Sequence, residues 1–152
     1  MPLNASTTIA ADPGRVYELV SDITQMGRWS PENTGGEWLD GATGPRVGAT
    51  FRGHNKRGMA KWSTTCEVTT AEPGQVFAFV VGTRRKPDTR WTYEFRADAA
   101  GTEVVETCEL IKPLGFFSRL LTRVTTGVRH READLVEGMQ QTLARLKQAA
   151  ES

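Results

Sequence analysis

The sequence predicts an α+β domain in which an antiparallel sheet packs against one long C-terminal helix. Three observations support this class. A short strand pattern opens the chain and two small helices follow it, whereas strand patterns separated by glycine and proline turns fill residues 35–111. From Pro113 onward the apolar residues recur at helical spacing. Strands and helices are therefore segregated along the chain, which is typical of α+β domains.

Residues 12–31 carry the clearest local signals. Asp12 can cap a helix that begins at Pro13, because a proline at the first position loses no intrahelical hydrogen bond. The apolar positions that follow form one buried stripe: Val16, Leu19, Val20 and Ile23. We predict a helix, a tight turn and a second short helix that closes at Trp29-Ser30-Pro31. Trp29 either anchors this turn or lines the mouth of a pocket.

Turn residues and alternation place the remaining elements. We expect strands near residues 3–10, 35–40, 49–56, 60–72, 75–82, 89–98 and 102–111. Two amphipathic stripes follow. The first consists of Phe116, Phe117, Leu120, Leu121 and Val124, and the second of Leu135, Val136, Met139, Leu143 and Leu146. These stripes predict a final helix from about residue 115 to 149, with a break near Gly127.

The opening segment resembles a known family. Residues 13–23 read Pro-Gly-Arg-Val-Tyr-Glu-Leu-Val-Ser-Asp-Ile, and Trp29-Ser30-Pro31 comes next. This string is similar to the start of the SRPBCC superfamily, the START-like helix-grip domains, and in particular to its polyketide cyclase/dehydrase-like branch. The resemblance is specific at residues 13–31 and 131–147 and follows the element order elsewhere. It implies one helix-grip domain over residues 1–152, with an antiparallel sheet of about seven strands curled around the C-terminal helix and a ligand cavity between them.

Length and composition limit the classes of partner. The 152 residues suffice for one core, and a net charge of +1 with 24% charged residues gives no electrostatic reason to expect nucleic acid. No apolar run approaches the roughly 18–20 residues of a membrane span, and the N-terminus lacks a signal-peptide pattern. Cys66 and Cys108 fit neither a disulfide framework nor a zinc motif. We therefore expect a cytoplasmic monomer or homodimer without integral membrane association.

Alternation within the strands predicts which side chains face the final helix. The inward set consists of Phe51, Trp62, Thr64, Trp91, Tyr93, Phe95, Glu106 and Cys108, joined by Leu135 and Met139 of the helix. Aromatic residues with a few polar groups are typical of a small-molecule pocket, and also of an ordinary core. The family resemblance favours the pocket. The strand at 75–82 is apolar on both faces, so the direction of Phe77 and Phe79 stays open.

Glu106 is the strongest candidate for a residue with a chemical role in the cavity. A carboxylate that faces a low-dielectric interior must be paired, be hydrogen-bonded or have its pKa raised. Glu106 and its neighbour Tyr93 are therefore weak candidates for acid/base catalysis, and Glu106 could equally orient a ligand hydroxyl. In a structural role, Glu106 would lie in water at the sheet edge or meet a basic side chain such as Arg131.

Other chemistry finds little support in the sequence. His54 shares the outward parity of Arg52 and Lys56, and His130 lies among charged residues, so neither has partners at metal-ligand spacing. The chain contains no nucleophile elbow, phosphate-binding loop or dinucleotide fingerprint. We predict that the protein uses no metal and no cofactor.

Three functions remain. The favoured one is a binder or carrier of a small hydrophobic molecule such as a polyketide, an acyl chain or a lipid. The second is an aromatase/cyclase-type enzyme, and the third an interaction module that docks through an apolar patch at residues 116–121. In enzymes of that kind an inward arginine stabilises enolates, whereas the strand cations of this chain fall on the outward parity. These cations are Arg52, Lys61, Arg90 and Arg96.

Overall fold

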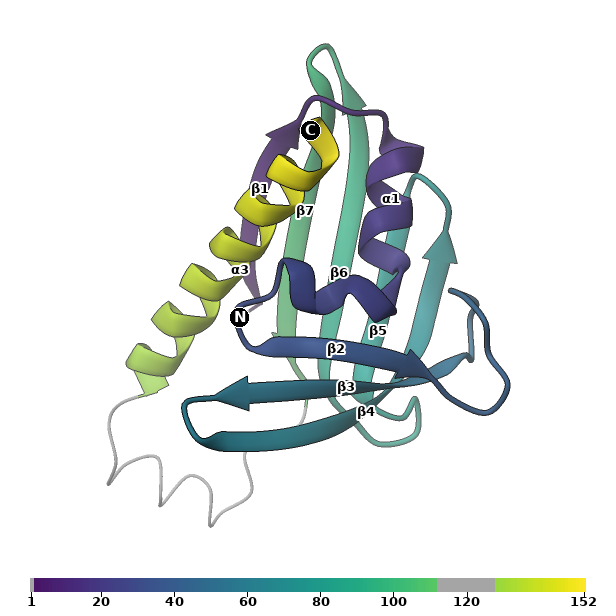
Figure 1. The fold of residues 1–152 in the computed structure, drawn as a ribbon, viewed down its shortest axis with the longest axis vertical. Coiled ribbons are helices and arrows are strands. Elements are labelled where there is room, and N and C mark those ends of the chain that lie inside the picture. The colour runs from purple at the N-terminus through teal and green to yellow at the C-terminus, as the bar shows by residue number, and fades with distance from the viewer. Residues whose placement is uncertain (1, 112–127) are drawn as a thin grey trace.

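The computed structural model describes residues 2–111 and 128–152 of the chain. The elements follow one another in the predicted order (Figure 1). They are β1 (Leu3–Ile9), α1 (Pro13–Ser21), the 3-10 helix η1 (Ile23–Arg28), β2 (Asn33–Trp38), β3 (Thr50–Arg57), β4 (Ala60–Glu72), β5 (Val76–Gly82), β6 (Pro87–Asp98), β7 (Gly101–Leu110) and α3 (Val128–Glu151). The predicted stripe at residues 116–124 and the break near Gly127 lie outside the described residues.

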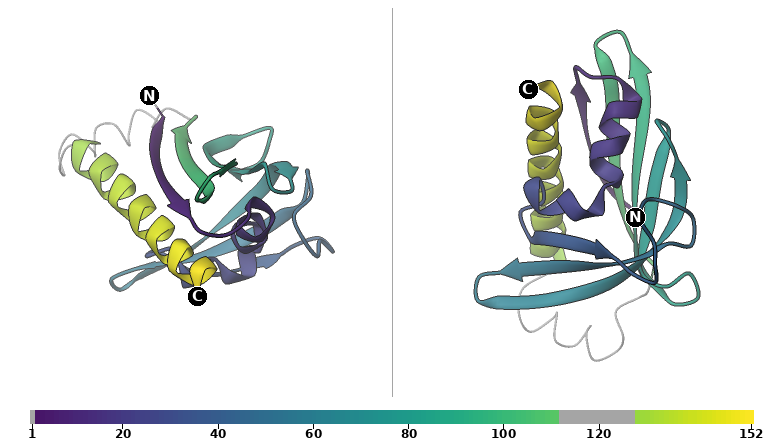
Figure 2. Two further views of the ribbon diagram at one scale, coloured as in Figure 1. Left: turned by 90° about the horizontal axis from the view of Figure 1, so that it is seen from above. Right: turned by 45° about the vertical axis from the view of Figure 1, so that its right-hand side comes forward.

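All seven strands form one antiparallel sheet in the order β1-β7-β6-β5-β4-β3-β2. The first strand pairs with the last, so that Leu3 lies opposite Cys108 and Ile9 opposite Thr102. The sheet curls so strongly that β2 and β3 cross the ends of β6 and β7, while α3 runs beside β1 (Figures 1 and 2). The predicted α+β helix-grip architecture is therefore confirmed. The predicted bounds of β2 and β6 differ from the observed ones by two residues.

Helix α1 covers one end of the concave face of the sheet (Figure 1). Asp12 accepts a hydrogen bond from the Arg15 backbone N–H at 3.0 Å, and Pro13 occupies the first turn, as the capping pattern predicts. The Tyr17 ring packs edge-on against Phe77 and Phe95, with centroid separations of 6.3 and 5.7 Å. These contacts fill the concave face beneath α1 with aromatic side chains.

Strand β5 is buried on both faces. Phe77 and Phe79 are 0% and 5% exposed and belong to the main core, whereas Ala78 and Val80 are buried on the other side. This explains why alternation could not orient the strand, because period-two alternation appears only where one face meets water.

The short helix η1 lies directly on β2. A Cβ atom on Gly36 would stand 2.7 Å from the Ile23 carbonyl oxygen, so only glycine allows this approach. Ile23 is fully buried, and Trp29, the C-cap residue of η1, is 4% exposed. This packing fixes the segment after η1 against the rest of the fold.

Helix α3 is anchored unevenly along its length. Met139, Leu143 and Leu146 are at most 2% exposed, whereas residues 132–134 are exposed. At the C-terminal end the Lys147 ammonium donates to the Thr8 carbonyl at 2.6 Å, and the Ala10 N–H donates to the Glu151 carboxylate at 2.8 Å. The C-terminal half of α3 is therefore tied to β1. None of the described helices is both long and apolar enough to cross a membrane.

Candidate functional site: a cavity between the sheet and helix α3

A cavity of about 800 Å³ lies between the concave face of the sheet and α3. Strands β3, β4, β5, β6 and β7 form one wall, α3 forms the other, and the segment around Trp29 contributes to the lining. Of the ten residues predicted to bind a ligand, nine belong to this lining. They are Phe51, Trp62, Thr64, Trp91, Tyr93, Glu106, Cys108, Leu135 and Met139. The geometry thus brings nearly all of the predicted set together around one space.

Phe95 is the exception. It lies on the same face of β6 as Tyr93, but it is 5% exposed and packs against Tyr17 beneath α1, away from the cavity lining. Alternation assigned Phe95 to the correct face of its strand. It does not show which part of that face a helix covers.

Several lining residues were not in the predicted set. Trp29 lines the cavity and also holds the segment after η1, so both interpretations of this residue apply. Asn55 lies on the face of β3 that Phe51 occupies, a parity that was already visible in the sequence. The place of Thr142 in the lining could not be predicted from the sequence, because a threonine hydroxyl within a helix usually donates to a backbone carbonyl of the same helix. Here it donates to the Gly138 carbonyl at 2.9 Å.

Glu106 and Tyr93 form the polar centre of the cavity wall. They are direct cross-strand partners on β7 and β6, and the Tyr93 hydroxyl donates to Glu106 Oε1 at 3.0 Å. Glu106 is only 2% exposed, and its Oε2 has no hydrogen-bond partner among the described residues. Glu106 therefore does not lie in water at the sheet edge. The side chain of Arg131, the other expected partner, lies outside the described part of the chain.

Burial controls the protonation of this pair. Desolvation raises the pKa of Glu106 to about 8, although the hydrogen bond from Tyr93 opposes the rise. Burial and the adjacent Glu106 carboxyl raise the pKa of Tyr93 well above its usual value. At neutral pH both groups therefore hold their protons, and the polar centre of the wall is uncharged.

The two cysteines of the lining are unreactive near neutral pH. Cys66 and Cys108 are free and buried, and desolvation raises their pKa values to about 11 and about 12. A thiol reacts as its thiolate, so neither side chain is an effective nucleophile near neutral pH. Within residues 2–111 and 132–152, no three His, Cys, Asp or Glu side chains lie close enough together to hold a metal ion.

Charged residues gather at the exposed end of the lining. Arg57, at the end of β3, lies 3.6 Å from the Glu32 carboxylate and 3.4 Å from the Asp134 carboxylate of α3. All three side chains are about half exposed, so each pair contributes little stability, ~0–1 kcal/mol. The ion pairs nevertheless connect three separate segments at the exposed end of the lining.

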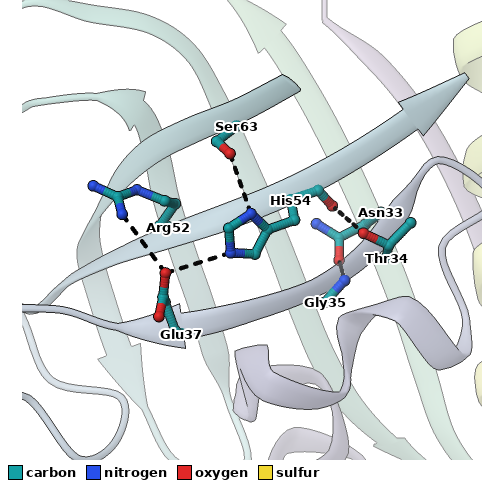
Figure 3. A network of polar contacts seen from close by, with 7 residues as sticks. All are labelled: Asn33, Thr34, Gly35, Glu37, Arg52, His54 and Ser63. Carbon is teal, nitrogen blue, oxygen red and sulfur yellow. Dashed lines mark hydrogen bonds and ion pairs between the residues drawn. The ribbon is translucent and has the colours of Figure 1, made fainter. Parts of the chain in front are cut away.

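A polar network covers the outer face of β2, β3 and β4 (Figure 3). A hydrogen bond of 3.1 Å joins His54 Nδ1 to Ser63 Oγ, and Glu37 Oε1 lies 3.4 Å from His54 Nε2 and 3.7 Å from Arg52. His54 is 44% exposed, as its parity predicts. The hydroxyl, imidazole and carboxylate follow the order of a nucleophile, base and acid. They lie in water on the face opposite the cavity, so we interpret them as a surface ion-pair network.

Comparisons with known proteins agree with this architecture. A family model described as polyketide cyclase / dehydrase and lipid transport matches residues 3–151. No curated protein matches the chain.

Solved structures extend the comparison. A polyketide-cyclase-like protein from Corynebacterium glutamicum, solved by NMR, is 31% identical, with a TM-score of 0.66 over 96% of this chain and 88% of the other. A Thermus thermophilus protein is 21% identical over 100% of both chains, with a TM-score of 0.67. The di-domain ARO/CYC protein BexL of the BE-7585A biosynthetic pathway is 15% identical, with a TM-score of 0.76 over 100% of this chain and 50% of its own. The chain belongs to the polyketide cyclase/dehydrase and lipid-transport family.

Proposed function

We propose that the protein binds a small, largely apolar molecule in the cavity and acts as its binder or carrier. The cavity between the sheet and α3 is the observation that carries this proposal. Its volume of about 800 Å³ falls within the range of small-ligand pockets, roughly 300–1,000 Å³. Its walls combine aromatic and aliphatic side chains with one carboxyl–phenol pair. The family description, which includes lipid transport, supports the same class of ligand.

The distribution of charge favours a neutral ligand. Glu106, Cys66 and Cys108 hold their protons at neutral pH, so the buried wall carries no charge at these positions. The cations among the described lining residues, Lys56 and Arg57, are both exposed. A charged group at the buried end would lose its hydration without gaining a partner, which costs several kcal/mol. Polyketides, acyl esters and neutral lipids meet this condition.

Native mass spectrometry of the freshly purified full chain tests this proposal directly. We expect a retained small molecule, or a complex of one Nile red molecule per chain after titration with this neutral, apolar dye. Saturable dye binding should quench the fluorescence of the cavity tryptophans, among them Trp91. Absence of both a retained molecule and saturable dye binding would refute the proposed function.

An aromatase/cyclase-type enzyme is the second candidate, because one observation favours it. Glu106 combines a pKa of about 8 with a hydrogen bond from Tyr93, and general acid/base catalysis works best when the pKa lies near the working pH. The strand arginines Arg52, Arg90 and Arg96 lie in ion pairs on the outer face, away from the cavity. This placement argues against enolate stabilisation by these three residues.

Turnover separates the two candidates. The protein is incubated with a short synthetic poly-β-ketone thioester, and cyclised products are measured by liquid chromatography and mass spectrometry. The enzyme proposal predicts that Glu106→Gln lowers turnover about 10²–10⁴-fold while substrate binding persists. Product formation equal to that in buffer would eliminate the enzyme proposal and leave the binder.

A further inference from the structure

We propose that Glu106 is the hydrogen-bond donor of the cavity, and that the ligand carries a neutral carbonyl oxygen that accepts the proton on Oε2. The inference rests on the proposed function, because it names the chemical group by which the cavity orients its apolar ligand. It concerns ligand recognition and requires no catalytic step.

The hydrogen bond with Tyr93 determines which oxygen of Glu106 carries the proton. The Tyr93 hydroxyl has one proton and donates it to Oε1, so Oε1 is the accepting oxygen of the carboxyl group. The proton of the neutral acid then lies on Oε2, which has no partner among the described residues and less than 1 Å² of exposed surface. A buried donor without an acceptor costs about 1–3 kcal/mol, and native proteins rarely leave one unsatisfied. Glu106 lines the cavity, so a ligand can supply the acceptor once the side chains around Oε2 shift enough to expose this oxygen.

The surroundings of Glu106 keep it neutral. Its cross-strand partners are Ala5 on β1 and Tyr93 on β6, and Cys108 follows on the same face of β7. None of these groups carries a positive charge, and burial raises the pKa of Glu106 to about 8. The buried residues that α3 and β4 contribute to the same lining are uncharged as well. They include Met139, Thr142 and Leu146 of α3 and Cys66 of β4.

The charged residues of the lining belong to its outer end. Their side chains are exposed or about half exposed, so water solvates them. They are Glu32, Lys56, Arg57, Asp134 and Glu137. In the described part of the chain, no ion pair involving Glu106 is formed.

A neutral donor selects among ligand groups. The oxygen of a ketone, ester or thioester accepts the proton of Oε2 without any change of charge. An amine would take the proton and leave a buried ion pair, and a carboxylate would bring an uncompensated charge into the cavity. The donor therefore matches neutral carbonyl compounds.

Two probes of nearly equal shape test the inference. Acetylnaphthalene carries a ketone oxygen where ethylnaphthalene has two hydrogens, and calorimetry with the full chain measures both affinities. At pH about 6 we expect the ketone to bind roughly three- to tenfold more tightly, the scale of one net hydrogen bond. At pH about 9 this preference should largely disappear, because Glu106 loses its proton through a pKa of about 8. Circular dichroism at both pH values verifies that the chain is folded.

Two variants give the hydrogen bond a matched control. Glu106→Gln should keep the ketone preference at both pH values, because its amide N–H donates as the neutral acid does and does not titrate. Glu106→Met has a similar size and no donor, so it should bind both probes equally.

The outcomes separate the inference from the proposed function. If both probes bind equally well to the parent at pH about 6, and equally well to Glu106→Gln at both pH values, the inference is wrong and the binding function stands. A ketone preference that grows as the pH rises would also overturn it. If neither probe binds saturably, the proposed function fails, and the inference fails with it.

Discussion

The protonation of Glu106 makes the stability of the fold depend on pH. In the unfolded chain this carboxyl titrates near its ordinary value of 4.5, whereas the folded chain retains the proton up to a pKa of about 8. Between these values the folded chain binds more protons, so the free energy of unfolding decreases as the pH rises. At about 1.4 kcal/mol per pKa unit, the full loss is about 5 kcal/mol. This loss is comparable with the total stability of a small domain, ~5–15 kcal/mol.

Urea unfolding followed by circular dichroism measures this dependence. From pH about 5 to pH about 8 we expect the parent chain to lose about 3–4 kcal/mol through Glu106, whereas Glu106→Gln lacks this loss. Glu109→Gln, on the exposed face of the same strand, controls for the removal of a charge and should follow the parent. Parallel pH profiles for the parent and Glu106→Gln would show that Glu106 is ionised in the folded chain, which would refute the reasoning.

Three further predictions concern packing, the cavity and a helix cap. Leu143→Ala should lower the free energy of unfolding by about 2–5 kcal/mol, because Leu143 is 1% exposed. The exposed control Gln148→Ala should change it by less than about 0.5 kcal/mol, and equal effects would show that α3 is rotated. Trp91→Ala should weaken Nile red binding in a fluorescence titration. Phe95→Ala should lower the free energy of unfolding by about 3–5 kcal/mol and leave the affinity for the dye unchanged. Weaker dye binding by Phe95→Ala and unchanged binding by Trp91→Ala would show that the cavity has been assigned to the wrong part of the sheet. Asp12→Ala should cost about 0.5–2 kcal/mol in thermal unfolding and Asp12→Asn much less, and equal losses would exclude a capping role.

The polar centre of the cavity shows what period-two patterning can predict. Tyr93 and Glu106 share the inward parity of consecutive strands, and a hairpin places consecutive strands side by side, so their contact could be expected from the sequence. The same reasoning put Phe95 on the correct face. It could not place Phe95 beneath α1, because the position of a helix over a sheet depends on tertiary packing.

The ion pairs at the exposed end of the lining could not be predicted from the sequence. Arg57, Glu32 and Asp134 meet there, although they lie on three separate segments of the chain. Charged residues at strand and helix ends are usually solvated, and nothing in their local pattern distinguishes a pair that joins distant segments. The direction of Phe77 and Phe79 was undetermined for a different reason, because β5 is buried on both faces.

Because α3 is anchored unevenly, the exchange rates of its backbone amides should differ between its two halves. Local opening requires less free energy where fewer contacts are buried, so amides of residues 132–138 should exchange faster than those of residues 142–148. The faster half is also the half that contributes Asp134 and Leu135 to the cavity lining. Fraying at this end therefore loosens the cavity lining, while every strand of the sheet stays paired. Ligand binding should accordingly slow exchange most at the N-terminal half of α3.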